Sequence, residues 1–162
     1  MTRDDMTLAF YDGAAADYAE KLADWEGRPD LVTFMAMLPE GGQVLDLGCG
    51  PGGASATLAK AGFRPDPVDA SPGMVRFAQD THGLPARLGD FEDDFGIASY
   101  DGIWASYCLL HARRDRLEDI VTRLARALKP GGALYIGMKL GAGEARDRLG
   151  RHYAYVSEAE LT

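Results

Sequence analysis

Four side chains with binding or proton-transfer chemistry stand at or just after predicted strands. Asp46 lies in an apolar stretch immediately before a glycine-rich turn, Asp69 and Asp90 each close or follow a later strand, and His111 comes shortly after another. Carboxylates accept hydrogen bonds from hydroxyl and amino groups, and a histidine changes charge near neutral pH. In α/β folds the loops beyond the carboxyl ends of strands carry ligand sites, so we expect a ligand site there.

The stretch that must position Asp46 is Val44–Gly53, which reads VLDLGCGPGG. Its apolar start predicts a buried strand, its glycines predict a turn, and Ala54–Ala61 has the composition of a helix. Glycine lets the backbone approach a ligand closely, and the first amides of a helix are unpaired. Gly48, Gly50 and Gly53 also match G-x-G-x-x-G, although a tight turn that binds nothing can have the same spacing.

The charge of Asp46 narrows the choice of ligand. A carboxylate beside the turn would repel a pyrophosphate and attract a cationic amino group. The string VLDLGCGPGG resembles the first motif of class I S-adenosylmethionine-dependent methyltransferases. The resemblance implies that Gly48, Cys49 and Gly50 hold the methionine part of the cofactor and that Asp46 helps to hold its ammonium group.

A second strand is expected over Phe63–Asp69, with strand character mainly at Pro67–Asp69 or with an irregular start, because each proline in a central strand would remove a ladder donor. Asp69 stands about 20 residues beyond the turn, where nucleotide-binding folds place an acid for the ribose hydroxyls. Charge matching at the start of the next helix is the alternative. VDASPGMV resembles the family's second motif, which implies cofactor contacts from Asp69, Ala70 and Met74.

Asp90 and Phe91 follow a short third strand expected over Ala86–Gly89. The family resemblance implies that this acid accepts from the adenine amino group and that the phenyl ring stacks on the base. A solvated acid within the acidic run that follows is the alternative.

A fourth strand over Tyr100–Ser106 leads to the acceptor side of the expected site. The resemblance implies that Ser106 contacts the cofactor and that the residues up to His111 face the methyl acceptor. The Asn/Asp-Pro-Pro-aromatic tetrapeptide of nucleobase amino-methylating enzymes is not present. His111 could deprotonate a hydroxyl or thiol of the acceptor, or it could serve only as a hydrogen-bonding residue.

The N-terminal segment 4–25 reads as a helix broken near Gly13, and Leu8, Tyr11, Tyr18 and Leu22 could share an apolar face. In the family this segment covers the cofactor cleft. The resemblance therefore implies that a tyrosine, Tyr18 among the candidates, closes over the sulfonium, whose charge suits a ring face. Packing of both tyrosines in the core or lid is the alternative.

The remaining pattern completes an α/β fold. Asp30 is expected to cap a helix over Leu31–Leu38, Leu117–Leu128 reads as an amphipathic helix, and Ala133–Met138 reads as a fifth strand. We predict a Rossmann-like, doubly wound and mostly parallel sheet with helices on both faces, truncated after the fifth strand. A single domain is expected: a helical lid (1–40), a cofactor-binding core (41–140), and a substrate-side loop with the start of a helix (141–162).

Composition limits the partners. The chain has 162 residues and a net charge of −8, which disfavours a broad nucleic-acid or anionic-membrane surface. It lacks an apolar run long enough to span a bilayer, and its cysteines and histidines lack metal-ligand spacing, so we expect a cytoplasmic protein without a metal site. The arginines between 146 and 151 suggest an anionic substrate or, alternatively, ion pairs with nearby acids. A bare fifth strand would favour a homodimer.

The function that these features predict is methyl transfer from S-adenosylmethionine to a small molecule. In-line placement of the two reactants can supply on the order of 7–11 kcal/mol, so a site without a strong acid or base still suits this chemistry. A nicotinamide-dependent oxidoreductase and a non-catalytic cofactor-binding protein or inactive fragment are the alternatives.

Overall fold

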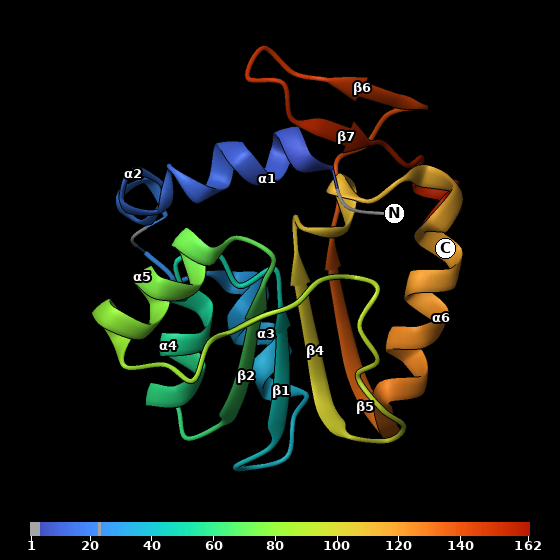
Figure 1. Cartoon of the computed structure of the whole chain (residues 1–162). Helices are drawn as coiled ribbons and strands as arrows, with labels where there is room; N and C mark the ends of the chain where they lie inside the picture. Colours follow the sequence, from blue (N-terminus) through green and yellow to red (C-terminus); the bar gives the residue numbers. More distant parts are fainter. Residues whose placement is uncertain (1–3, 23) are drawn as a thin grey trace.

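A parallel sheet forms the centre of the computed structural model, which describes residues 4–22 and 24–162. Its five strands lie in the order β3-β2-β1-β4-β5, and every neighbouring pair is parallel (Figure 1). The strands are β1 (Gln43–Leu47), β2 (Arg64–Asp69), β3 (Arg87–Leu88), β4 (Tyr100–Ser106) and β5 (Leu128–Gly137).

Helices and short connecting elements surround this sheet, and a separate antiparallel hairpin stands above its carboxyl end (Figure 1). The α-helices are α1 (Asp5–Asp12), α2 (Ala15–Lys21), α3 (Pro29–Ala36), α4 (Gly53–Lys60), α5 (Pro72–His82) and α6 (Leu117–Ala127). The 3-10 turns are η1 (Leu109–His111), η2 (Arg114–Arg116) and η3 (Glu158–Glu160). The hairpin strands are β6 (Glu144–Arg146) and β7 (His152–Ala154).

The two faces of the sheet are covered by different helices because successive strand residues point to opposite sides. Val44 of β1 packs in one cluster with Phe34 of α3 and Leu58 of α4. Leu45, the next residue of β1, packs in another cluster with Leu124 of α6. Each fully buried side chain of this size contributes about 1.5–3 kcal/mol. The predicted Rossmann-like sheet with helices on both faces is therefore confirmed.

The strand order places the ligand crevice. β1 is paired with β2 on one side and with β4 on the other, so the winding direction changes between β1 and β4. Ligands of open parallel sheets bind outside the carboxyl ends of the strands at such a switch point. Asp46 lies near the carboxyl end of β1, Asp69 ends β2 and Ser106 ends β4.

The second strand is longer than expected, because both prolines fit the ladder. The Arg64 amide donates to the Gly42 carbonyl at 2.9 Å, so this residue and its alternate neighbours along β2 face β1. Pro65 and Pro67 alternate with those residues and face the other side, where β3 pairs only with Val68 and Asp69. Neither proline therefore removes a needed donor. The strand expected over Phe63–Asp69 is present and is regular from Arg64, rather than mainly at Pro67–Asp69.

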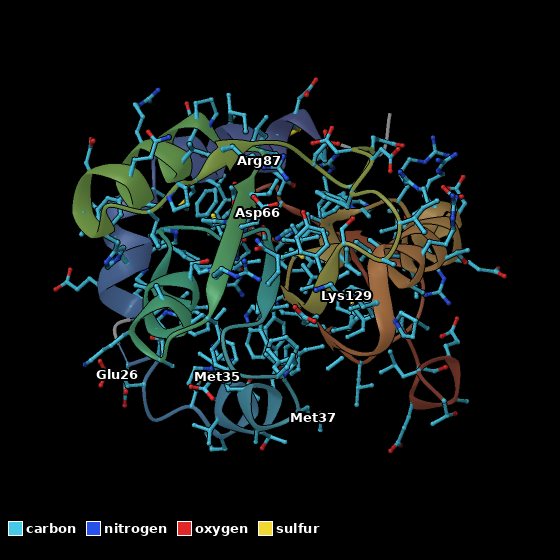
Figure 2. The ribbon with its side chains drawn as sticks, turned by 90° about the horizontal axis from the view of Figure 1, so that it is seen from below. Glu26, Met35, Met37, Asp66, Arg87 and Lys129 are labelled. Carbon is cyan, nitrogen blue, oxygen red and sulfur yellow. The ribbon has the colours of Figure 1, made fainter. Side chains whose placement is uncertain are left out.

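Side chains fix the very short strand β3 to the sheet. Arg87 of β3 and Asp66 of β2, which lie close together in Figure 2, share two hydrogen bonds of 2.9 Å. The Tyr100 hydroxyl of β4 donates to the same carboxylate at 2.6 Å. The Asp66 carboxylate therefore links β2 and β3, on one side of β1, to β4 on its other side.

Three local expectations differ from the structure. Asp30 does not cap α3. It lies in the first turn, where its carboxylate accepts from Arg28, Tyr135 and the Leu31 amide. The fifth strand begins at Leu128 rather than Ala133, with a register irregularity opposite Tyr100–Gly102. The start of a helix expected within 141–162 is only a 3-10 turn, which begins at a capping box formed by Ser157 and Glu160.

The expected substrate-side loop contains the β6–β7 hairpin. Its strands have only three residues each and lack a clear alternating pattern, which explains why sequence periodicity did not reveal them.

β5 is an edge strand of the main sheet, and the homodimer expected from such an edge stays a prediction. None of the described helices is long and apolar enough to cross a membrane.

The turn after β1 requires glycine at one position above all. Gly48 has φ +70°, and a Cβ there would lie 2.4 Å from the Cβ of Cys108. We expect Gly48→Ala to lower the free energy of unfolding by about 2–4 kcal/mol, from left-handed strain plus overpacking. Gly62→Ala is the control, because Gly62 has φ +91° with no atom within 4 Å of the added Cβ. Equal losses in urea denaturation would contradict the close approach.

Candidate functional site

A cavity of about 270 Å³ opens at the carboxyl end of the sheet, between the strand ends and the N-terminal helices. Every residue predicted to bind the cofactor or to act in catalysis lines it. These residues are Tyr18, Asp46, Gly48, Cys49, Gly50, Asp69, Ala70, Met74, Asp90, Phe91, Ser106 and His111. The structure thus brings together side chains that are scattered over most of the chain, although their individual roles stay predictions.

Asp46 is the buried charge of the site. Only 2% of its surface is exposed, and its carboxylate accepts a 2.7 Å hydrogen bond from the Ser55 hydroxyl of α4. Burial raises the pKa of Asp46 to about 7, Ser55 opposes the rise, and the negative charge of Asp69 adds to it. An acid with this pKa is only partly ionised at neutral pH, and a cationic ligand in the cavity would favour its charged form.

Asp69 holds the glycine turn in place. One carboxylate oxygen accepts from the Gly50 amide at 2.8 Å, and the other accepts from the Ser71 amide at 2.9 Å, at the start of α5. The Gly48 and Cys49 amides donate to the Val68 carbonyl at 2.8 and 2.9 Å. Each carboxylate oxygen can accept more than one hydrogen bond, so Asp69 can serve the helix start and still accept from a ligand.

Asp90 and Phe91 form another wall of the cavity. An Asp90 oxygen accepts from the Glu92 amide at 2.8 Å, and the Asp90 amide donates to Asp93, which fixes the loop after β3. Phe91 is half-buried against the cluster that includes α6. An acid and a ring are thus fixed side by side at the cavity.

His111 is tied to two other segments. Its Nδ1 lies 2.7 Å from the His152 carbonyl oxygen, which can only accept, so Nδ1 carries the proton. Nε2 then accepts from the Tyr11 hydroxyl of α1 at 3.0 Å, and that hydroxyl oxygen accepts from Arg151 at 3.2 Å. Burial lowers the pKa of His111 to about 4. His111 is therefore a neutral imidazole at neutral pH, with its basic nitrogen already occupied.

The helices α1 and α2 cover the cavity with the expected apolar face, because Leu8, Tyr11, Tyr18 and Leu22 all line it. The break between these helices falls at Gly13, as predicted. The Tyr11 and Tyr18 rings meet edge to face with centroids 5.5 Å apart. Burial raises the pKa of Tyr11, so its hydroxyl stays protonated.

Two of the three arginines between 146 and 151 have acidic partners, which was the alternative to an anionic substrate. Arg146 pairs with Asp4 at 2.8 Å, and Arg151 pairs with Asp147 at 2.6 Å. The charges of Arg146 and Arg151 are thus used within the protein, whereas Arg148 is exposed, and the anionic character of the substrate stays a prediction.

Sequence reasoning missed Trp25 and Arg28, which also line the cavity. Arg28 lies over the Trp25 ring at 4.4 Å and donates to Asp30 from Nε and Nη2 at 3.1 and 2.6 Å. Among the described residues that line the cavity, Arg28 is the only lysine or arginine. Trp25 ends the segment 4–25 that was predicted as a helix, and Arg28 follows three residues later. A tryptophan and an arginine so close together within the expected lid were the available signal.

Comparison with known proteins agrees with this geometry. A family described as "Methyltransferase domain" matches residues 44–132. Demethylmenaquinone methyltransferase of Tropheryma whipplei (strain Twist) is 31% identical over 100 residues, which are 59% of this chain and 41% of that protein. The 2-methyl-6-phytyl-1,4-hydroquinone methyltransferase of Synechocystis sp. is 31% identical over 126 residues, or 74% of this chain and 37% of that protein. The chain thus spans about two fifths of each relative's length.

A solved structure extends the likeness over nearly the whole chain. Burkholderia thailandensis 1,6-didemethyltoxoflavin-N1-methyltransferase, with bound 1,6-didemethyltoxoflavin and S-adenosylhomocysteine, superposes with a TM-score of 0.75 and 25% identity. The match covers 96% of this chain and 72% of that chain. The family match and the S-adenosylhomocysteine-bound neighbour identify S-adenosylmethionine as the cofactor. The chain belongs to the class I S-adenosylmethionine-dependent methyltransferase family.

Proposed function

We propose that this chain transfers a methyl group from S-adenosylmethionine to a small-molecule acceptor. The observation that carries the proposal is the buried Asp46 carboxylate in a cavity at the carboxyl end of the sheet, with Arg28 also in its lining. The methionine end of the cofactor bears an ammonium and a carboxylate. A cavity that offers one buried acid and one arginine suits both groups.

The individual contacts follow from the chemistry of the lining. Asp46 would hold the ammonium, and Arg28 would hold the carboxylate through Nη1, which donates no hydrogen bond to any described residue. The remaining lone pairs of Asp69 suit the ribose hydroxyls. Asp90 and Phe91 suit the amino group and the ring of adenine. The division into lid, core and substrate-side segment belongs to the same proposal.

The cofactor, when bound, supplies an activated methyl group on a positive sulfonium, so the protein's main tasks are placement and exclusion of water. Ser106 and His111 would face the acceptor, and Tyr18 would close over the cofactor. The aromatic residues Tyr11, Trp104 and Tyr107 also line the cavity and favour a planar, partly apolar acceptor. Two relatives bear the names of quinone or hydroquinone methyltransferases, which is consistent with such an acceptor.

His111 would act as a base only after the acceptor displaces the Tyr11 hydroxyl. Its Nε2 lone pair is then free to accept a proton from an acceptor hydroxyl or thiol, while the His152 carbonyl holds Nδ1–H. A non-catalytic cofactor-binding protein would show S-adenosylhomocysteine binding but no acceptor-dependent methyl transfer.

The first prediction concerns pH and Asp46. Because the pKa of this carboxyl is about 7 and a cationic ligand needs the ionised form, affinity for S-adenosylhomocysteine should rise as pH increases from 6 to 8. Asp46→Asn should weaken binding about 10- to 100-fold at pH 8 and flatten this pH dependence, given about 1.5–3 kcal/mol for a charged hydrogen bond. Calorimetric titration measures both effects.

The control ligand for that titration is 5′-deoxy-5′-methylthioadenosine, which lacks the amino-acid end. Its affinity should be the same for wild type and Asp46→Asn. Equal weakening of both ligands, or unchanged S-adenosylhomocysteine binding by Asp46→Asn, would contradict the assigned role.

The second prediction concerns Arg28. Arg28→Gln should weaken S-adenosylhomocysteine about tenfold or more and leave 5′-deoxy-5′-methylthioadenosine unaffected, because only the first ligand has a carboxylate. Arg113→Gln is a matched control: Arg113 donates to Asp115 with the same pair of distances, 3.1 and 2.6 Å, outside this cavity. A loss of affinity in Arg113→Gln, or none in Arg28→Gln, would refute the role of Arg28.

The third prediction concerns the protonation of His111. Nitrogen-15 NMR of histidine-labelled protein should show a neutral, Nδ1-protonated ring from pH 5 to 8, because burial lowers its pKa to about 4. Tyr11→Phe should raise that pKa, since the Tyr11 hydroxyl stabilises the neutral ring. The other two histidines, His82 and His152, can be removed to assign the signals. A ring that is charged at pH 7 would contradict this account.

A further inference from the structure

The helix α1 lies across the cavity and is fixed at both ends by separate parts of the chain. Asp4, Thr7, Leu8 and Tyr11, at or in this helix, line the cavity. Figure 1 shows α1 above the strand ends, with the β6–β7 hairpin over its N-terminal end and α5 below its other end. Opening of either attachment would move α1 and widen the way out for a ligand bound beneath it.

The attachment at the C-terminal end of α1 is compact. An Asp12 oxygen accepts from the Gly73 amide at 2.6 Å and from the Ser71 hydroxyl at 3.3 Å, at the start of α5. The backbones also meet closely, since a Cβ on Gly73 would lie 2.2 Å from the Asp12 carbonyl oxygen. These contacts hold the C-terminal end of α1 against α5. At Gly13, directly after this end, an added Cβ would have no atom within 4 Å.

The attachment at the N-terminal end is electrostatic. Arg146 of β6 donates to both oxygens of Asp4, at 2.8 and 2.9 Å, and this pairing holds the pKa of Asp4 well below its usual range. The same carboxylate accepts from the Thr7 hydroxyl at 2.8 Å, and the Thr7 oxygen accepts from the His152 amide of β7 at 2.8 Å. The hairpin therefore contacts the first turn of α1 through several connected hydrogen bonds, from Arg146 to Asp4 and from His152 to Thr7, and not through a single ion pair.

A second contact from the hairpin reaches further along the lid. Arg151 donates to the Tyr11 hydroxyl at 3.2 Å and lies over the Phe10 ring at 4.8 Å. Tyr11 in turn donates to His111, whose other nitrogen donates to the His152 carbonyl. The hairpin thus determines both where the lid lies and how His111 is held.

We propose that the β6–β7 hairpin is the latch of the lid, with Arg146 as its main positioning residue. In this proposal, which rests on the proposed function, α1 opens by losing the Arg146–Asp4 network and swings about its attachment to α5. The latch then limits the rate at which S-adenosylhomocysteine leaves. Arg146 is itself partly solvent-exposed, so salt should weaken the latch by screening.

The test is stopped-flow measurement of S-adenosylhomocysteine dissociation from the full chain, followed by tryptophan fluorescence, since Trp25 and Trp104 both line the cavity. Arg146→Gln and Asp4→Asn should each increase the dissociation rate about fivefold or more at low salt. The wild-type rate should rise with added sodium chloride, and the rate of Arg146→Gln should rise much less. Melting temperatures show whether each variant is folded.

Two further variants separate a latch from a general structural role. The double variant Asp4→Asn with Arg146→Gln should release the ligand at about the same rate as Arg146→Gln alone, because asparagine can still cap α1 at Thr7 and the ion pair is already lost. Arg148→Gln is the control, because Arg148 is an exposed arginine of the same hairpin turn and should leave the rate unchanged.

Each result supports or refutes the latch. A wild-type dissociation rate in Arg146→Gln would overturn it, as would a double variant that releases the ligand much faster than Arg146→Gln, since the two changes would then act independently. If wild-type protein binds S-adenosylhomocysteine but Arg146→Gln and Asp4→Asn release it at the wild-type rate, the latch fails and the proposed function stands. If wild-type protein does not bind it, the proposed function fails and the latch fails with it.

Discussion

The burial of the Asp46 carboxylate is the constraint on which the rest of the site depends. An isolated buried charge is costly, and the acid has few compensating partners, chiefly Ser55 of α4. The fold accepts this cost at the end of its central strand, where β1 lies between β2 and β4 and cannot move. A nearby cation would favour the ionised form of such an acid, and this is the physical basis for proposing that it holds the ammonium group of the cofactor. The apolar packing of Val44 and Leu45 on opposite faces keeps that acid in place.

The remaining parts of the site differ in how firmly they are held. The strand ends carry Asp46 and Asp69 and belong to the packed core, and backbone amides fix their turns. The lid and the hairpin, by contrast, are attached mainly by side-chain hydrogen bonds and ion pairs near the surface. If the proposed latch is correct, this difference lets the packed strand ends hold the cofactor while the lid and the hairpin open to release the product.

The sequence was sufficient to predict which residues at the strand ends and in the N-terminal helices line the cavity, but not the long-range contacts that hold those helices in place. Asp46, Asp69 and Asp90 were predictable because each position depends on a local pattern, a strand followed by a turn, and parallel topology brings strand ends together. The contacts from Tyr11 to His111 and from Asp4 to Arg146 join residues 100 and 142 positions apart, and no local pattern signals them.

Other misses have equally local physical reasons. The prolines of β2 were misjudged because their tolerance depends on which neighbour each nitrogen faces, and that is a property of the sheet rather than of the strand. Asp30 was taken for a helix cap because its partners Arg28 and Tyr135 become visible only in the folded chain.

The most direct measurement of the central claim is a crystal structure of the chain grown with S-adenosylhomocysteine. The account predicts that the ligand's ammonium lies beside Asp46 and its carboxylate beside Arg28. It also predicts that the adenine amino group faces Asp90 and that the adenine ring lies against Phe91. A ligand bound elsewhere, or bound with its amino-acid end away from Asp46, would contradict it.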